Sequence, residues 1–240
     1  MKYGIQLYSM RDLAERDFEA AVAKAAEIGY GMIEFAGFFG RSAEQVVELL
    51  KKNDIELFGT HCGMGELVND FEGTLKFHKA IGNKNYIISH HPMRNKAEID
   101  DFAELIKKYQ PMLEAEGIRL SYHNHSMEFL PNEDGILSHP ELLARTNIGF
   151  EIDTFWAFNA GQDPVALMEK YGDRLTCIHL KDGFKGGLGM PLGKGEAPVA
   201  AVYAKAIELN IPIIVESETC SPSGPEEAQI CFDCIKSLEK

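Results

Sequence analysis

Residues 148–180 read IGFEIDTFWAFNAGQDPVALMEKYGDRLTCIHL and decide the fold. The stretch begins and ends with short apolar, β-branched segments that are typical of buried strands, Ile148–Asp153 and Leu175–Leu180. Between them, Pro164 stands where the first turn of a helix would begin. This order of strand, helix and strand predicts a βαβ unit with two parallel strands.

The same alternation runs through the rest of the chain. Eight segments have the character of strands: Tyr3–Tyr8, Met32–Ala36, Ile55–His61, Tyr86–His90, Ile118–His123, Ile148–Asp153, Leu175–Leu180 and Ile211–Glu216. Dividing 240 residues by eight gives 30 residues a unit, the size of one β-α repeat. No linker or break in composition interrupts the series. We therefore expect residues 1–240 to form one domain, a single closed (β/α)8 TIM barrel, with an open doubly wound sheet as the alternative.

Charge and composition exclude several classes of partner. The chain has 24 Lys and Arg against 37 Asp and Glu, a net charge of −13, which disfavours nucleic acid and anionic membranes. No run reaches the roughly 18 apolar residues of a membrane span. No signal peptide is visible, so we expect a cytoplasmic protein. The oligomeric state stays open, a homo-oligomer included.

The five cysteines are an odd number and do not suggest a disulfide framework. Cys231 and Cys234 form a C-x-x-C motif, which is also found in redox and zinc sites. Ile230, Ile235 and Leu238 extend the pair into one helical stripe, which favours plain core cysteines.

Most of the histidines lie near the predicted strand ends, where a barrel has its active site. Active sites of such barrels lie at the C-terminal ends of the strands, and chance would place about one of the histidines there. Six of the eight follow or end a predicted strand: His61, His90, His91, His123, His125 and His179. The alternative for each is a polar residue that closes the core without a chemical role.

Acidic residues join them at the same level: Glu34, Glu128, Asp153 and Glu216. Three carboxylates and one imidazole from neighbouring strands make a mixed site for one divalent ion (Mn²⁺, Zn²⁺, Mg²⁺, Co²⁺ or Fe²⁺). Glu151 competes with Asp153 because both lie on one face of the strand, and Asp153 is preferred as nearer the C-terminal end. Glu34 has a second interpretation, as an ion-pair partner.

The longest irregular stretch, Gly183–Glu196, contains six glycines but does not match a Walker A loop. We expect it to be a mobile flap over the site, with Lys185 and Lys194 available to an anionic group of the substrate. A solvated loop without a role is the alternative.

Several segments together resemble the xylose-isomerase-like TIM barrels, the sugar phosphate isomerase/epimerase superfamily. They are Gly4-Ile-Gln-Leu-Tyr-Ser9, Tyr122-His-Asn-His125 with Glu128-Phe129, Glu151-Ile-Asp-Thr-Phe-Trp156, Ile178-His-Leu-Lys-Asp182, Leu192-Gly-Lys-Gly-Glu196 and Ile214-Val-Glu216. The resemblance implies a divalent metal held from strands five to eight, and Asp153, His179 and Glu216 match directly. Many relatives carry Glu where this chain has His123, so Glu128 is expected to supply that ligand. Epimerase relatives carry His where this chain has Trp156.

Such a site favours one kind of chemistry. A metal on a sugar carbonyl and its neighbouring hydroxyl acidifies the C–H between them, and a carboxylate then moves the proton. We expect an isomerase or epimerase of a sugar, keto-sugar or sugar phosphate, with a dehydratase of a keto-inositol or 3-keto-sugar as the alternative. The expected catalytic residues are Glu128, Glu216, His123 and Lys181, and the expected substrate contacts are Gln6, Glu34, His61, His125 and Trp156.

Three other functions are weaker. A nuclease similar to endonuclease IV would need a DNA-binding surface, which a charge of −13 opposes. A non-catalytic sugar-binding barrel would have lost its ligands, and a glycosidase acting through Glu128 and Glu216 would need no metal.

Overall fold

The computed structural model describes residues 2–239 and has a closed parallel barrel at its centre. The strands follow one another in the order β1-β10-β7-β6-β5-β4-β3-β2, and β1 pairs with both β2 and β10, which excludes the open sheet. Each predicted strand overlaps an observed one. The strands are Gly4–Gln6 (β1), Met32–Phe35 (β2), Glu56–Cys62 (β3), Asn85–Ile88 (β4), Arg119–His123 (β5), Gly149–Asp153 (β6), Leu175–Leu180 (β7) and Ile213–Val215 (β10). The prediction of a (β/α)8 barrel is confirmed.

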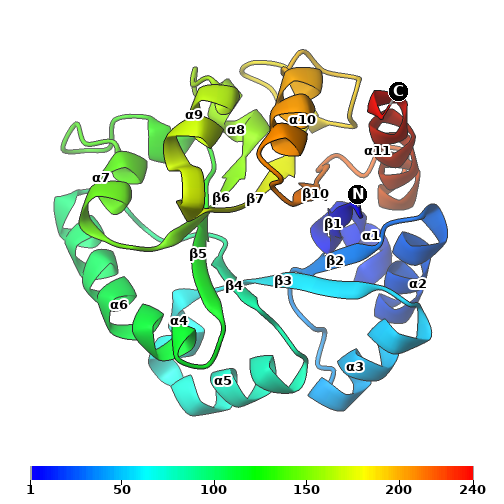
Figure 1. Ribbon diagram of the computed structural model, residues 1–240, viewed down its shortest axis with the longest axis horizontal. Helices are drawn as coiled ribbons and strands as arrows, with labels where there is room; N and C mark the ends of the chain where they lie inside the picture. Colours follow the sequence, from blue (N-terminus) through cyan, green and yellow to red (C-terminus); the bar gives the residue numbers. More distant parts are fainter. Residues whose placement is uncertain (1, 240) are drawn as a thin grey trace.

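Helices surround the strands on all sides (Figure 1). They are Arg11–Ala14 (α1), Phe18–Ile28 (α2), Ala43–Lys52 (α3), Met64–Asn69 (α4), Phe71–Ala80 (α5), Lys96–Glu114 (α6), Ser138–Arg145 (α7), Thr154–Asn159 (α8), Pro164–Tyr171 (α9), Val199–Glu208 (α10) and Gly224–Leu238 (α11), with short 3-10 turns at Leu7–Met10, Met127–Phe129 and Gly172–Arg174. Within the described residues, none of these helices is both long and apolar enough to cross a membrane.

Local signals in the sequence set the helix ends. The capping box predicted at Ser42 is present: the Ser42 side chain accepts from the Gln45 amide, and the Gln45 side chain accepts from the Ser42 amide. Gly29 ends α2 in the left-handed conformation with φ of +118°, which glycine adopts without strain. These signals fix where each helix returns to the barrel.

Side chains alternate along each strand, with apolar residues facing the helices and polar residues facing the barrel interior. On β6, Phe150 and Ile152 belong to the buried apolar core, whereas Glu151 and Asp153 belong to polar clusters with residues of other strands. On β7, Ile178 and Leu180 pack in the core, and His179 faces the polar clusters. The barrel interior therefore carries ionisable side chains, while the space between strands and helices is filled by apolar ones.

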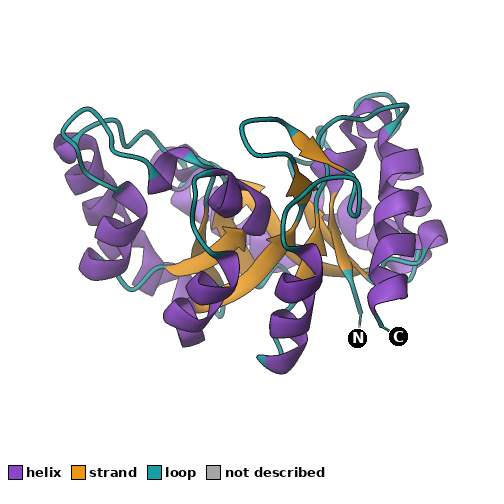
Figure 2. Cartoon of the chain, turned by 90° about the horizontal axis from the view of Figure 1, so that it is seen from above, coloured by secondary structure: helices purple, strands orange, loops and turns teal. Residues whose placement is uncertain are grey.

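The segment predicted to be a mobile flap, Gly183–Glu196, has regular structure where it leaves the barrel. Asp182–Gly183 (β8) and Gly189–Met190 (β9) pair as a small antiparallel hairpin, which lies on the side of the barrel opposite to the two termini (Figure 2). The Asp182 carboxylate is buried and accepts four backbone N–H groups, those of Gly183, Gly193, Gly195 and Ala197, at 2.8–3.0 Å. Residues 184–188 at the tip are exposed. Motion of the tip stays a prediction.

The C-x-x-C motif lies within α11. Cys231 is fully buried and its sulfur accepts from the Leu192 amide, while Cys234 is half-buried. All five cysteines are free, so the interpretation of Cys231 as a core residue agrees with the structure.

Candidate active site

A cavity of about 540 Å³ opens at the C-terminal end of the barrel, within the range of roughly 300–1,000 Å³ typical of small-molecule sites. Imidazoles and carboxylates both contribute to its wall. The lining residues are Tyr8, Ala36, Gly37, His61, Cys62, Gly63, Glu66, Ser89, His90, His123, His125, Glu216 and Glu218. Four of the histidines that the sequence placed at strand ends therefore meet in one cavity.

Four donor groups from four strands converge at the floor of this cavity. His123 (β5), Asp153 (β6), His179 (β7) and Glu216 (after β10) each offer a ligand atom, and these atoms all lie within 4.8 Å of one another. All four side chains are buried. Three of them, Asp153, His179 and Glu216, are the ligands that the sequence predicted.

The environment of Asp153 fits a divalent ion. Its Oδ1 accepts from the Trp156 amide at 2.8 Å and caps α8, while its buried Oδ2 has no hydrogen-bond partner. Burial raises the pKa of Asp153 to about 7, although the Lys181 ammonium lies 3.4 Å from Oδ2. A buried carboxylate oxygen of this kind needs a cation, and two carboxylates with two imidazoles suit Mn²⁺, Fe²⁺, Co²⁺ or Zn²⁺.

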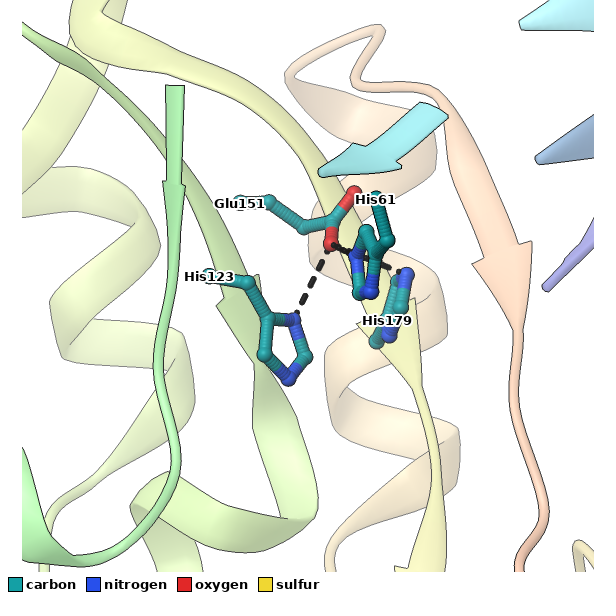
Figure 3. A group of neighbouring side chains, drawn as sticks. All are labelled: His61, His123, Glu151 and His179. Atoms are coloured by element: carbon teal, nitrogen blue, oxygen red, sulfur yellow. Dashed lines mark hydrogen bonds and ion pairs between the residues drawn. The ribbon is translucent and has the colours of Figure 1, made fainter. Parts of the chain in front are cut away.

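A second layer lies beneath these donors and is centred on Glu151 (Figure 3). Glu151 Oε1 lies 2.6 Å from His61 Nε2, 3.0 Å from His123 Nδ1 and 3.0 Å from His179 Nε2. The Cys177 thiol donates to Glu151 Oε2 at 2.9 Å. A carboxylate that accepts from one ring nitrogen fixes the tautomer and leaves the other nitrogen free to bind a metal. Glu151 therefore orients the two imidazoles of the donor group.

Gln6 and Glu34 belong to the same deep layer. The Gln6 amide donates to Glu34 Oε1 at 2.7 Å, and His179 Nε2 lies 2.9 Å from the same oxygen. Both residues are fully buried. Burial raises the pKa of Glu34 to about 7, with the nearby Glu151 charge as the second cause. Their observed polar contacts are with each other, with imidazoles and, for Gln6, with the Tyr8 amide, and their predicted contact with a substrate stays a prediction.

Lys181 supplies the cation that the structure places against the carboxylates. Its Nζ lies 2.7 Å from Glu218, 3.1 Å from Glu216 and 3.4 Å from Asp153, and it sits 4.9 Å from the centre of the Trp156 ring. Burial alone would raise the pKa of Glu216, but Lys181 and His179 hold that pKa well below its usual value. Glu216 is therefore ionised and able to accept a proton.

Glu128 is not brought into the donor group. The Tyr122 hydroxyl donates to its Oε1, and the His125 amide donates to its Oε2, both at 2.8 Å. It lies instead in a separate cluster with His90 and His125, beside a larger, mostly apolar cavity of about 770 Å³. The structure thus places His123, not Glu128, next to Asp153 on the fifth-strand side, and Glu128 holds the loop that carries His125.

Two residues of the site were not predicted to act in it. Glu151 was set aside in favour of Asp153, although period two puts both on one face of β6, and Glu151 lies one layer deeper. Glu218 follows Glu216 by two residues, the same spacing, and this was the available signal for its contact with Lys181.

His78 and His139, the two histidines away from strand ends, are core residues. His139 is fully buried between Phe129 and Phe150, and its Nδ1 lies 2.6 Å from the Tyr171 hydroxyl. Burial lowers the pKa of His139 to about 3, so its ring is neutral.

Comparison with known proteins agrees with this architecture. A model of the xylose isomerase-like TIM barrel family matches residues 22–238. An inosose dehydratase of Mesomycoplasma hyopneumoniae is 26% identical in an alignment of length 190 that covers 69% of this chain and 62% of that protein, so the chain spans about three fifths of its length.

Solved structures show the same fold. A sugar phosphate isomerase/epimerase of Parabacteroides distasonis superposes with a TM-score of 0.84 at 21% identity, over 97% of this chain and 96% of that one. A D-allulose 3-epimerase of Methylomonas sp. superposes with a TM-score of 0.72 at 15% identity, over 99% and 98%. The fold, and a family match that covers nine tenths of the sequence, lead to one conclusion: this chain belongs to the xylose isomerase-like TIM barrel family.

Proposed function

We propose that the protein is a divalent-metal-dependent lyase that removes water from a polyhydroxy ketone of the keto-inositol type. The observation that carries the proposal is the placement of carboxylates and imidazoles across one cavity. Glu216 and Glu218 follow β10, whereas His61, His90 and His125 lie on or after β3, β4 and β5, on the other side of the barrel, where Glu66 of α4 also lies. A base facing a set of proton donors suits an elimination, in which a proton leaves one carbon and a hydroxyl leaves the next.

His123, Asp153, His179 and Glu216 would hold the ion. When bound, it supplies polarisation of the substrate carbonyl and stabilises the negative charge that develops on its oxygen. Glu151 contacts His123 Nδ1 and His179 Nε2, so the opposite ring nitrogens, His123 Nε2 and His179 Nδ1, would be the ones that hold the ion.

Proton transfer is assigned to residues of the two walls. Glu216 takes the proton from the carbon next to the carbonyl. Lys181 keeps Glu216 ionised and in place through its contact of 3.1 Å. The opposite wall delivers a proton to the departing hydroxyl, which leaves as water. His125 is the candidate donor because it lines the cavity and Glu128 holds its backbone.

The names of the curated relatives support this reaction class. The Mesomycoplasma protein and a Geobacillus kaustophilus protein, 23% identical over 83% of this chain and 80% of its own, are both inosose dehydratases. Isomerisation or epimerisation is the second candidate, because Glu216 on one wall can also return its proton to a neighbouring carbon. A nuclease is opposed by the carboxylates that line the cavity, which would repel a phosphate backbone.

The test uses the metal-loaded protein with 2-keto-myo-inositol in D₂O, followed by NMR and mass spectrometry. We expect a product that has lost one water. Glu216→Gln should abolish exchange of the C–H as well as product formation, whereas exposed Glu48→Gln on α3 should retain both. Exchange with deuterium and no loss of water would instead favour the isomerase. Neither exchange nor product would contradict the proposal.

A further inference from the structure

Two places in this barrel have the form of anion sites, and the chain fills both with its own carboxylates. The first is the glycine-rich segment after β7, where backbone N–H groups converge as they do in phosphate-binding loops. Here Asp182 accepts four of these N–H groups at 2.8–3.0 Å and is buried. No N–H of this set is left for a phosphate oxygen.

The second place is the N-terminus of α11, which follows the last barrel strand. Barrels of this type frequently bind phosphate with the loops after strands seven and eight and with a helix N-terminus. In this chain the Asp12 carboxylate accepts the Gly224 amide at 3.2 Å, and the Ser223 side chain accepts the Glu226 amide. A Cβ placed on Gly224 would lie 2.5 Å from the Ser9 carbonyl oxygen, so the start of α11 packs closely against the segment that follows β1.

Apart from the divalent ion proposed at its floor, the lining of the cavity offers an anion no free cation, and Lys185 and Lys194 of the glycine-rich segment are not part of that lining. Among the described residues that line it, none is Lys or Arg, and Glu66 and Glu218 bring negative charge to its wall. Lys181 lies beside the cavity but is already surrounded by Asp153, Glu216 and Glu218. Arg11, near the same rim, donates to the backbone carbonyls of Tyr8 and Glu218 and lies over the Tyr8 ring.

From these observations we infer that the site selects an uncharged polyhydroxy ketone and rejects its phosphorylated and carboxylated counterparts. The inference rests on the proposed function and narrows its substrate class. Hydroxyl groups find donors and acceptors in the imidazole and carboxylate walls, whereas a phosphate in the same cavity would be repelled by Glu66 and Glu218, which line it. Specificity of this kind comes from repulsion of the wrong ligand as well as attraction of the right one.

The first test measures anion binding without any reaction. Metal-free protein is titrated with inorganic phosphate at constant ionic strength and followed by calorimetry and thermal denaturation. We expect a Kd above about 10 mM, weaker than the millimolar range of even modest sites. Submillimolar binding of phosphate would overturn the inference whatever carbohydrate the protein uses.

The second test compares matched ligands on the metal-loaded protein. D-fructose and D-fructose 6-phosphate differ by the ester group, and 2-keto-myo-inositol serves as the ligand of the proposed reaction. We expect the phosphate ester to bind at least about tenfold more weakly than fructose in 50 mM salt, with a smaller difference in 300 mM salt because salt screens the repulsion. A phosphate ester that binds as tightly as fructose, or more tightly, would overturn the inference.

A substitution at Glu66 tests whether this carboxylate is a source of the repulsion. Glu66→Gln removes one charge from the wall and should strengthen binding of the phosphate ester about threefold relative to binding of fructose. Glu48→Gln on α3 is the matched control and should leave the ratio of the two affinities unchanged. An equal effect of both variants would contradict the assignment. If keto-inositol is not turned over but the order of affinities holds, the proposed function fails and the charge selectivity stands.

Discussion

Replacing Glu151 separates a residue that orients metal ligands from one that binds the metal itself. Glu151→Gln keeps the size of the side chain and removes its charge. The wild-type Oε1 lies within 3.0 Å of a ring nitrogen on each of His61, His123 and His179. We expect the variant to fold and to bind a divalent ion more weakly.

The size of the effect follows from these contacts. Loss of one carboxylate behind a ligating histidine typically weakens metal binding by 10–100-fold. Glu151 supports two of the four proposed ligands, so a loss near the upper end, about 100-fold, is expected. That loss corresponds to roughly 2.7 kcal/mol of binding free energy. Asp153→Asn removes a proposed ligand directly and should weaken binding further.

Competition with a fluorescent Zn²⁺ chelator at pH 7 measures both variants, with circular dichroism to confirm folding. Glu141→Gln, half-exposed on α7, is the control and should bind as the wild type does. Wild-type affinity in Glu151→Gln would refute the orienting role. A larger loss in Glu151→Gln than in Asp153→Asn would show that the ion is held by Glu151 with His61, His123 and His179, a group whose donor atoms also lie within 4.8 Å of one another.

Three further predictions concern other parts of the molecule. His123→Ala should lose most metal affinity in the chelator assay while Glu128→Ala keeps it, and the reverse pattern would restore Glu128 as the ligand. The pKa of His139 is about 3 in the folded protein against 6.5 in the unfolded chain, so its contribution to stability is complete above pH 6.5 and is lost as the pH falls toward 3. Urea unfolding should therefore give a free energy of unfolding about 2 kcal/mol lower at pH 5 than at pH 7. His139→Phe should make this free energy depend less on pH. Asp182→Ala should speed amide exchange at Gly193 and Gly195 by at least about tenfold, because each loses its acceptor, and unchanged exchange would show that the hairpin is held by other contacts.

The fold was predictable because the same local sequence signals recur in each β-α unit. Each unit carries a short apolar run and a capped amphipathic helix, and Ser42 with Gln45 shows that even a helix start can be assigned from the order of residues. The same period of two that defines a strand also put Glu151 with Asp153, and His179 with Lys181, on one face of their strands. The convergence of Asp153, His179 and Glu216 followed once the barrel was assumed.

The depth of a residue along the barrel axis was not predictable in the same way. Glu151 and Asp153 share a face, and only the stagger of neighbouring strands puts one beneath the cavity and the other at its floor. Glu128 lies in a loop, where no regular alternation of side chains predicts the direction of a residue. Its two hydrogen bonds hold it away from the donor group. Asp182 contacts amides 11–15 residues further along, a separation beyond any local pattern.

The pairing of β1 with β10 has a consequence for the order in which the molecule assembles. Gly4 and Ile5 pair with Ile214 and Val215, and Asp12 accepts from Gly224 across 212 residues of chain. During synthesis, one edge of β1 therefore has no partner until nearly the whole barrel has been made. Contacts of such separation close late and slowly, so the exposed edge is the place where a nascent chain is most open to aggregation. Chaperones that cover strand edges would matter most for this protein in the interval before residues 213–224 emerge from the ribosome.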